Sequence, residues 1–146
     1  MSLAGPFPVE AAIEQLRSVT ELRLIGGAGG LQAAQRSQPR ALPAAYLLVR
    51  ERGRRPADYT DGYAQPMDVS LIVVLWVAHA GDETGERAAK EMTKLERAVR
   101  TRLRDWSPGK PFEPLYVSDS GNDIHLGAHL TRQVIFQTQY RDQELP

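Results

Sequence analysis

The hydrophobic pattern is densest between Asp68 and Ala78, where apolar side chains occupy both alternating sets of positions. Such a run is typical of a β-strand that is covered on both faces of its sheet. We therefore predict a strand over residues 66–79. The amphipathic segment at 84–106, which begins with acidic and capping residues, predicts a helix that covers one face of this strand. The other face needs a second cover, and another subunit is a candidate for it.

Weaker periodicities divide the rest of the chain into short elements. Apolar residues recur at helical spacing after Pro8, a residue that the first turn of a helix tolerates. Alternating or mostly apolar runs, bounded by glycine, proline and polar residues, predict strands. The pattern predicts a helix at 8–19, a turn of helix at 31–36, and further strands at 21–25, 44–50, 115–118 and 126–140. The polar residues at 119–123 favour a tight turn that joins the last two strands.

The order of these elements predicts a single α+β domain that spans residues 1–146. Its architecture is an α/β two-layer arrangement, in which two helices pack on one face of an antiparallel or mixed sheet of about four to five strands. The length of 146 residues suits one domain with a substantial core.

The segment 51–66 interrupts the apolar pattern and is predicted to form a projecting hairpin arm. It combines arginines, prolines, glycines and tyrosines, and it is too polar and too broken to form core. Charged runs are usually solvated surface, and contact with nucleic acid on a local patch is a further interpretation. Arginine and tyrosine are also enriched at protein interfaces, and long loops often carry function. We therefore assign candidate interface residues to the arm and its base, namely Arg50, Arg52, Arg54, Arg55, Tyr59 and Tyr63.

The second face of the long strand provides another candidate interface. Ile72, Val74 and Trp76 lie opposite the face that the two helices would cover. Each large apolar side chain left in water forgoes about 1.5–3 kcal/mol of burial free energy, so an open face of this kind favours self-association. The sequence thus predicts an oligomer that forms through this face or through the arm.

Composition narrows the range of functions. The 18 basic and 18 acidic residues give a net charge of zero, which provides no overall field toward nucleic acid or an anionic membrane. The absence of cysteine excludes disulfides, thiolate nucleophiles and cysteine-ligated zinc. The amino terminus has no signal-peptide pattern, and no apolar run reaches the roughly 20 residues of a membrane span. We expect a protein that is made and kept in the cytosol.

Two groups of residues resemble reactive or ligand-binding motifs without matching them. The glycine cluster at 26–30 could cradle a phosphate, but it lacks the residues that complete the P-loop and Rossmann motifs. A flexible turn is therefore favoured. His79 lies near Asp82 and Glu83, which would suit an acid–base cluster, but a strand end followed by a helix cap is the simpler interpretation.

A third group has the residue types of a metal site. His125 and His129, with Asp119 and Asp123 nearby, could ligate zinc or manganese. On a strand, however, the two histidines would share a face and lie about 13 Å apart at ~3.3 Å per residue. Solvated turn residues are favoured. We therefore predict no catalytic residues, no metal and no cofactor.

The order of the elements and the residues of four stretches match a known pattern. The stretches lie at 7–16, 41–50, 69–78 and 127–136, and a Gly-Asp-x-Thr-Gly turn follows the third. Together they resemble the tail-terminator-like proteins of tailed phages and prophages. The resemblance covers nearly the whole chain and includes no catalytic signature. It implies a small domain with helices on one side of a sheet, and a structural role without enzymatic activity.

Proteins of this kind assemble as a ring on the end of the completed tail tube, where they stop polymerisation and offer a surface for joining the head. The resemblance implies a hexamer whose partners are further copies of the chain, the tail-tube protein and a head-completion or connector protein, with no membrane and no specific nucleic acid. The expected location is the bacterial host cytoplasm during assembly and then the virion tail. Two alternatives stay open: another head–tail connector or tail-tube protein, and a small metal- or nucleotide-dependent enzyme.

Overall fold

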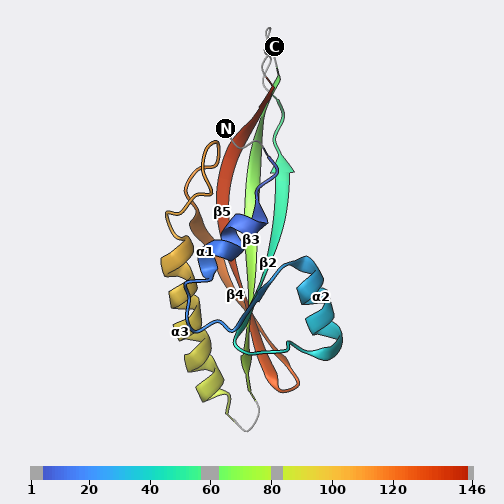
Figure 1. Ribbon diagram of the computed structural model, residues 1–146, viewed down its shortest axis with the longest axis vertical. Helices are drawn as coiled ribbons and strands as arrows, with labels where there is room; N and C mark the ends of the chain where they lie inside the picture. Colours follow the sequence, from blue (N-terminus) through green and yellow to red (C-terminus); the bar gives the residue numbers. More distant parts are fainter. Residues whose placement is uncertain (1–4, 57–62, 80–83, 145–146) are drawn as a thin grey trace.

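The computed structural model describes residues 5–56, 63–79 and 84–144 (Figure 1). Within these residues the chain forms three α-helices and five β-strands. They are α1 (Val9–Leu16), β1 (Leu24–Gly26), α2 (Ala28–Ser37), β2 (Ala44–Gly53), β3 (Tyr63–Ala78), α3 (Glu86–Leu103), β4 (Tyr116–Leu126) and β5 (His129–Glu144).

The five strands form one mixed sheet in the order β1-β2-β3-β5-β4. β1 pairs parallel with β2, and the other neighbouring strands are antiparallel. At one end of the elongated molecule, β2, β3 and β5 run past the helices (Figure 1). The α+β class predicted from the sequence is confirmed.

α1 and α3 cover one face of the sheet and form the main core (Figure 1). Alternate residues of β3, including Leu71 and Val73, point into this layer. There they meet Leu16 of α1 and the apolar stripe of α3, which includes Leu95 and Val99. This layer agrees with the two helices that the sequence placed on one face.

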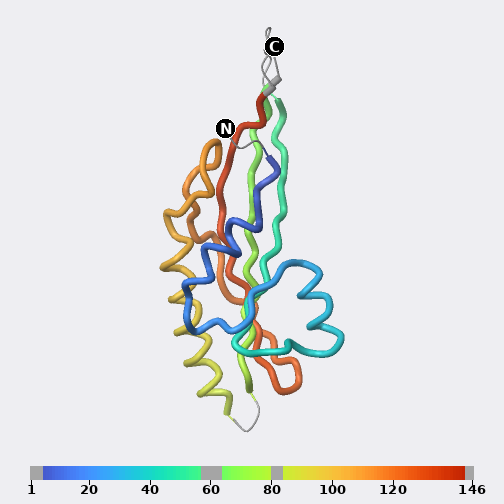
Figure 2. The backbone as a smooth tube through the Cα atoms, in the orientation of Figure 1, coloured from blue at the N-terminus to red at the C-terminus, as the bar shows by residue number. Residues whose placement is uncertain are grey.

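A third helix, α2, lies on the opposite face of the sheet (Figure 2). Its Leu31 and Ala34 pack with Tyr46, Val74 and Trp76 in a second, smaller core. The Trp76 side chain is only 3% exposed and meets the Tyr46 ring edge to face, with ring centroids 6.3 Å apart. The expectation that Val74 and Trp76 lie on an uncovered face is therefore wrong, because α2 covers them.

The glycine cluster at 26–30 forms the junction between β1 and α2 and is not a flexible turn. Gly26 ends the strand, and Gly30 already lies within the helix. A Cβ atom on either residue would lie 3.1 Å from the Tyr46 ring, so glycine lets the start of α2 pack directly against this ring. The cluster therefore serves packing, and the turn of helix predicted after it is part of α2.

β4 and β5 meet in a hairpin whose turn differs from the predicted one. The hairpin closes between Leu126 and His129, and Gly127 has a φ of 57°, which suits the first position of a two-residue hairpin turn. The turn expected at 119–123 lies within β4 instead. There the pairing shifts register and Gly121 has a positive φ. These turn-forming residues produce β-bulges, because pairing with β5 continues on both sides of them.

The sheet continues into the segment that the sequence assigned to an arm. β2 stays paired with β3 as far as Gly53, and Ala64 of β3 is buried. β5 extends alongside β3 in this region and supplies a third paired strand. The interpretation of the whole segment 51–66 as lying outside the core is therefore wrong near its two ends.

Glu51 ties three distant parts of the chain together at this end of the sheet. Its Oε1 accepts a hydrogen bond from the Tyr140 hydroxyl at 2.6 Å, and its Oε2 accepts one from the Phe7 backbone N–H at 2.6 Å. The rings of Phe7 and Tyr140 both pack against Phe112. Burial, together with the bond to Glu51, raises the pKa of Tyr140, so its hydroxyl stays a donor at neutral pH.

Replacing Glu51 with alanine is expected to lower the free energy of unfolding by about 2–3 kcal/mol, because two partly buried donors lose their acceptor. Urea denaturation followed by tryptophan fluorescence measures the change. Glu113→Ala is the matched control: this exposed carboxylate accepts a side-chain bond from Gln139, and its loss should cost less than about 1 kcal/mol. Equal losses in the two variants would contradict the anchoring role of Glu51.

Candidate assembly surface

α2 leaves part of the second face of the sheet uncovered. The strand register places Leu48, Ile72 and Ile135 side by side across β2, β3 and β5. All three side chains are partly exposed, and Ile135 packs in neither of the two cores. An apolar row therefore crosses three strands beside the small core under α2.

The edge strand β4 extends this apolar surface. Tyr116, Ile124 and Leu126 are 59%, 44% and 43% exposed, and their partners on β5 place them on the same face as Ile135. Exposed apolar residues that gather on one surface, unlike scattered ones, indicate a contact site. We call this surface the open sheet face, and it consists of Leu48, Ile72, Tyr116, Ile124, Leu126 and Ile135.

Polar side chains without charge lie among these apolar residues. Gln133 and Gln137 flank Ile135 at alternate positions of β5, and the Gln137 side chain donates a hydrogen bond to the Ser70 hydroxyl at 2.7 Å. An apolar centre with polar neighbours is typical of a protein interface. The arrangement offers area for contact and holds no convergent set of reactive groups among the described side chains.

Two of the predicted arginines extend the open sheet face at one end. Arg50 and Arg52 occupy alternate positions of β2 on the same side as Ile72, and both are exposed. Arg54 follows β2, and its Nε lies 3.2 Å from a carboxylate oxygen of Asp68. The structure therefore joins the two interfaces that the sequence proposed separately, the base of the arm and the second sheet face.

The other predicted interface residues have different positions. Val74 and Trp76 lie under α2, as described above, and do not form surface. Arg55 is exposed beyond the end of β2, and Tyr63 begins β3. Tyr59 lies outside the described residues.

Sequence reasoning missed Ile135 and the residues of β4. Ile135 is the one apolar residue among the alternate positions from Gln133 to Gln137, on the side of β5 that the sequence assigned to solvent. This exposed apolar residue could have indicated an interface. Ile124 was hidden because the turn predicted at 119–123 placed it outside a strand. Only the register shows that Ile135 lies beside Ile72.

The candidate metal ligands do not converge. The hairpin turn separates His125 from His129, and the register directs their side chains to opposite faces of the sheet. The His125 ring lies against His79, with centroids 4.8 Å apart, and the His129 ring lies 5.6 Å from Trp76. The expectation that both histidines share one face is wrong, because they belong to two strands. In the part of the chain that the structure describes, no three histidine, aspartate or glutamate side chains could hold a metal ion together.

The candidate acid–base cluster around His79 is only partly described. His79 follows the end of β3, and its backbone N–H donates to the Ala128 carbonyl at 2.6 Å. Its suggested acid–base partners, Asp82 and Glu83, lie outside the described residues.

Among the helices of the described ranges, none has the length and apolar character to cross a membrane.

A comparison with protein families shows which kind of protein carries this surface. The model of the phage tail terminator protein family matches residues 2–143, nearly the whole chain. The chain belongs to this family. It is a structural protein of phage tails, in agreement with the resemblance seen in the sequence. A structural tail protein acts through surfaces that contact other tail proteins. The open sheet face is therefore the leading candidate for a contact surface of this tail terminator.

A solved structure has the same fold as this tail terminator. It is a chain from the virion of a native gene transfer agent particle, which matches with a TM-score of 0.51 and 17% sequence identity over 90% of this chain and 92% of that chain. At this identity the match shows the fold alone. No curated protein matches the tail terminator significantly.

Proposed function

We propose that this tail terminator assembles as a ring, a hexamer by the resemblance of its sequence, on the end of the tail tube. There it stops tube polymerisation and presents a surface to a head-completion or connector protein. The observation that carries the proposal is the family match over residues 2–143. The ring forms in the host cytoplasm and becomes part of the virion tail. The family is structural, which supports a role that involves contacts and no catalysis.

The open sheet face is the proposed contact between neighbouring copies. Its apolar row and the exposed residues of β4 would be removed from water by a second copy, while the glutamines around them can exchange water for partner hydrogen bonds. Arg50 and Arg52 extend the contact at one end, where arginine commonly contributes to interfaces. This surface thus combines the features that a copy-to-copy contact requires.

The size of the apolar contribution indicates when the ring forms. Tyr116, Ile124 and Leu126 are about half exposed, so burying each of them contributes on the order of 1 kcal/mol. Association of two proteins costs about 4–15 kcal/mol in lost translational and rotational freedom. Free copies are therefore expected to associate weakly. A tube end that binds several copies raises their effective concentration and completes the ring.

The proposal is tested by polymerising the cognate tube protein with and without the purified tail terminator. Negative-stain electron microscopy should show shorter tubes that carry a ring at one end when the tail terminator is present, and light scattering should show little self-association without the tube protein. Tubes of unchanged length and without terminal rings would contradict the proposal. Binding to isolated heads instead of tube ends would favour another head–tail connector role.

A further inference from the structure

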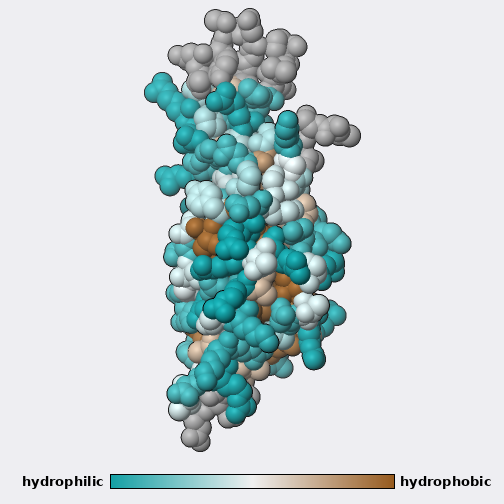
Figure 3. Space-filling model, turned by 90° about the vertical axis from the view of Figure 1, so that its left-hand side faces the viewer, coloured by the Kyte–Doolittle hydropathy of each residue, from teal (hydrophilic) through white to brown (hydrophobic). Residues whose placement is uncertain are grey.

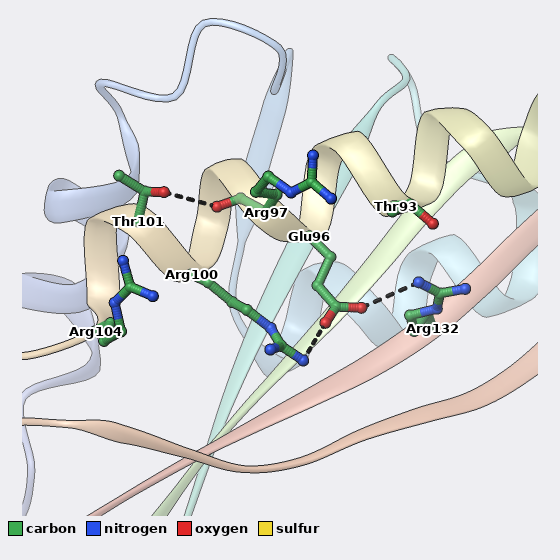
Figure 4. Close-up of a pocket in the computed structure, with 7 residues that line it drawn as sticks. All are labelled: Thr93, Glu96, Arg97, Arg100, Thr101, Arg104 and Arg132. Carbon is green, nitrogen blue, oxygen red and sulfur yellow. Dashed lines mark hydrogen bonds and ion pairs between the residues drawn. The ribbon is translucent and has the colours of Figure 1, made fainter.

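A hollow of about 590 Å³ lies along α3, beside Arg132 of β5 (Figure 4). Arg97 and Arg100 lie on α3 and Arg104 caps its C-terminal end, at intervals of about one turn, and Arg132 reaches the hollow from β5. We call this hollow the arginine groove, and its lining consists of Thr93, Glu96, Arg97, Arg100, Thr101, Arg104 and Arg132. Four guanidinium groups and one carboxylate give the lining a net charge of +3, in a chain whose net charge is zero.

Part of this charge is neutralised within the chain. Glu96 is only 8% exposed, and its carboxylate oxygens lie 2.5 Å from Arg100 Nη2 and 3.1 Å from Arg132 Nη1. Arg132 also donates two hydrogen bonds of 2.7 Å to the Asp123 carboxylate. These bonds hold the pKa of Asp123 below its usual range and raise the pKa of Arg132, so this pair stays ionised at neutral pH. Each of the three nitrogens of the Arg132 guanidinium group therefore already donates to a carboxylate.

Arg97 and Arg104 keep unused donors, since among the described residues no side chain accepts a hydrogen bond from either of them. The Nε of Arg100 also has no hydrogen-bond partner, but it is buried and out of reach of a ligand. A planar guanidinium group binds a carboxylate through two parallel hydrogen bonds, as Arg132 already does with Asp123. The solvent-facing part of the groove thus offers guanidinium donors of the same kind that bind the Asp123 carboxylate.

The arginine groove and the open sheet face lie on opposite sides of the sheet. α3 covers the first face, whereas the open sheet face belongs to the second. The side of the molecule seen in Figure 3 is largely hydrophilic, with small apolar spots. The open sheet face does not itself include the groove, so the two surfaces can contact different partners.

We propose that the arginine groove binds a carboxylate-rich segment of another tail protein. Arg97 and Arg104 are about 10.5 Å apart along the helix axis at 1.5 Å per residue, which accommodates two or three carboxylates of one segment. Duplex DNA fits less well, because it carries a charge about every 1.7 Å along its axis, a spacing far denser than that of Arg97 and Arg104. That the partner is a tail protein rests on the proposed function; the preference for carboxylates rests on the groove alone.

The test measures binding of a fluorescein-labelled hexaglutamate peptide to the purified chain by fluorescence anisotropy at low ionic strength. The Arg97→Ala, Arg104→Ala double variant should bind at least tenfold more weakly. The Arg23→Ala, Arg40→Ala double variant removes the same charge from exposed positions elsewhere and should bind within about twofold of the unmodified chain. A hexaglutamine peptide and a labelled DNA duplex are measured beside them.

Three results would overturn the inference: no binding of the hexaglutamate peptide, an equal loss in both double variants, or tighter binding of the duplex that is lost only in the groove variant. The last result would indicate a nucleic-acid site. The four substituted arginines, at positions 23, 40, 97 and 104, are all exposed, so both double variants should fold normally. Thermal melts check this and exclude unfolding as the cause of weaker binding. The assay contains no tube protein, so its failure leaves the ring proposal intact. A failed ring assay leaves the preference of the groove for carboxylates intact and removes only the argument that the partner is a tail protein.

Discussion

Replacing Ile135 with lysine is expected to abolish ring formation on the tail tube without unfolding the protein. Ile135 lies at the middle of the open sheet face and packs in neither core, so the lysine side chain remains in water in the free protein. A contact between copies would bury its charge without a partner, at a cost of several kcal/mol. This exceeds the roughly 3 kcal/mol that the exposed residues of β4 contribute to the contact. The measurement is the fraction of tube ends with rings in electron micrographs.

A matched variant separates this effect from a simple change in charge. Gln32→Lys adds the same charge at an exposed position of α2 and should leave ring formation unchanged. Both variants should melt within a few degrees of the unmodified chain, because neither residue belongs to a core cluster. Normal rings with Ile135→Lys would show that the copies meet through another surface.

Replacing Trp76 with alanine is expected to lower the free energy of unfolding by about 3–5 kcal/mol, the usual cost of removing a large buried aromatic side chain. The loss follows from the position of Trp76 between α2 and the sheet, where its ring meets Tyr46. Denaturation in urea, followed by circular dichroism because a tryptophan is removed, gives the change.

Two further variants show whether Trp76 is core or interface. Tyr116→Ala removes another aromatic residue on the same face, but one that is 59% exposed, and should cost less than about 1 kcal/mol. Trp76→Phe should cost less than Trp76→Ala, because the ring is kept and the Trp76 Nε1 has no hydrogen-bond partner among the described residues. A small effect of Trp76→Ala on stability, with loss of ring formation, would restore Trp76 to the interface that the sequence suggested.

Local periodicity predicted the elements well where it was long and regular. The apolar stripe of α3 and the doubly apolar run of β3 each appear at about their predicted places. The prediction was weaker where the residue types favour one local structure and the neighbouring elements of the fold impose another. Turn-forming residues at 119–123 form β-bulges, because pairing with β5 continues on both sides of them. The glycines at 26–30 join β1 to α2, because they let the helix pack against the Tyr46 ring.

The candidate sites show the same division. The sequence singled out Arg50, Arg52 and Ile72, and all three lie on one surface, although the proposed reason for Ile72 was a face without any helix. The arginine groove was not predicted, because Arg132 and Glu96 are 36 positions apart and belong to a strand and a helix. No periodicity within either element indicates that their side chains meet.

The sequence by itself determined that a strand in the middle of this chain is apolar on both faces and that something must cover each of them. It also determined the family, through stretches spread over nearly the whole chain. Only the tertiary structure decided what covers the second face: α2 covers Val74 and Trp76, and the row formed by Leu48, Ile72 and Ile135 is left open. The physical reason is that burial depends on the register of strands far apart in the chain and on where a short helix docks, and neither is encoded in the spacing of residues within one segment.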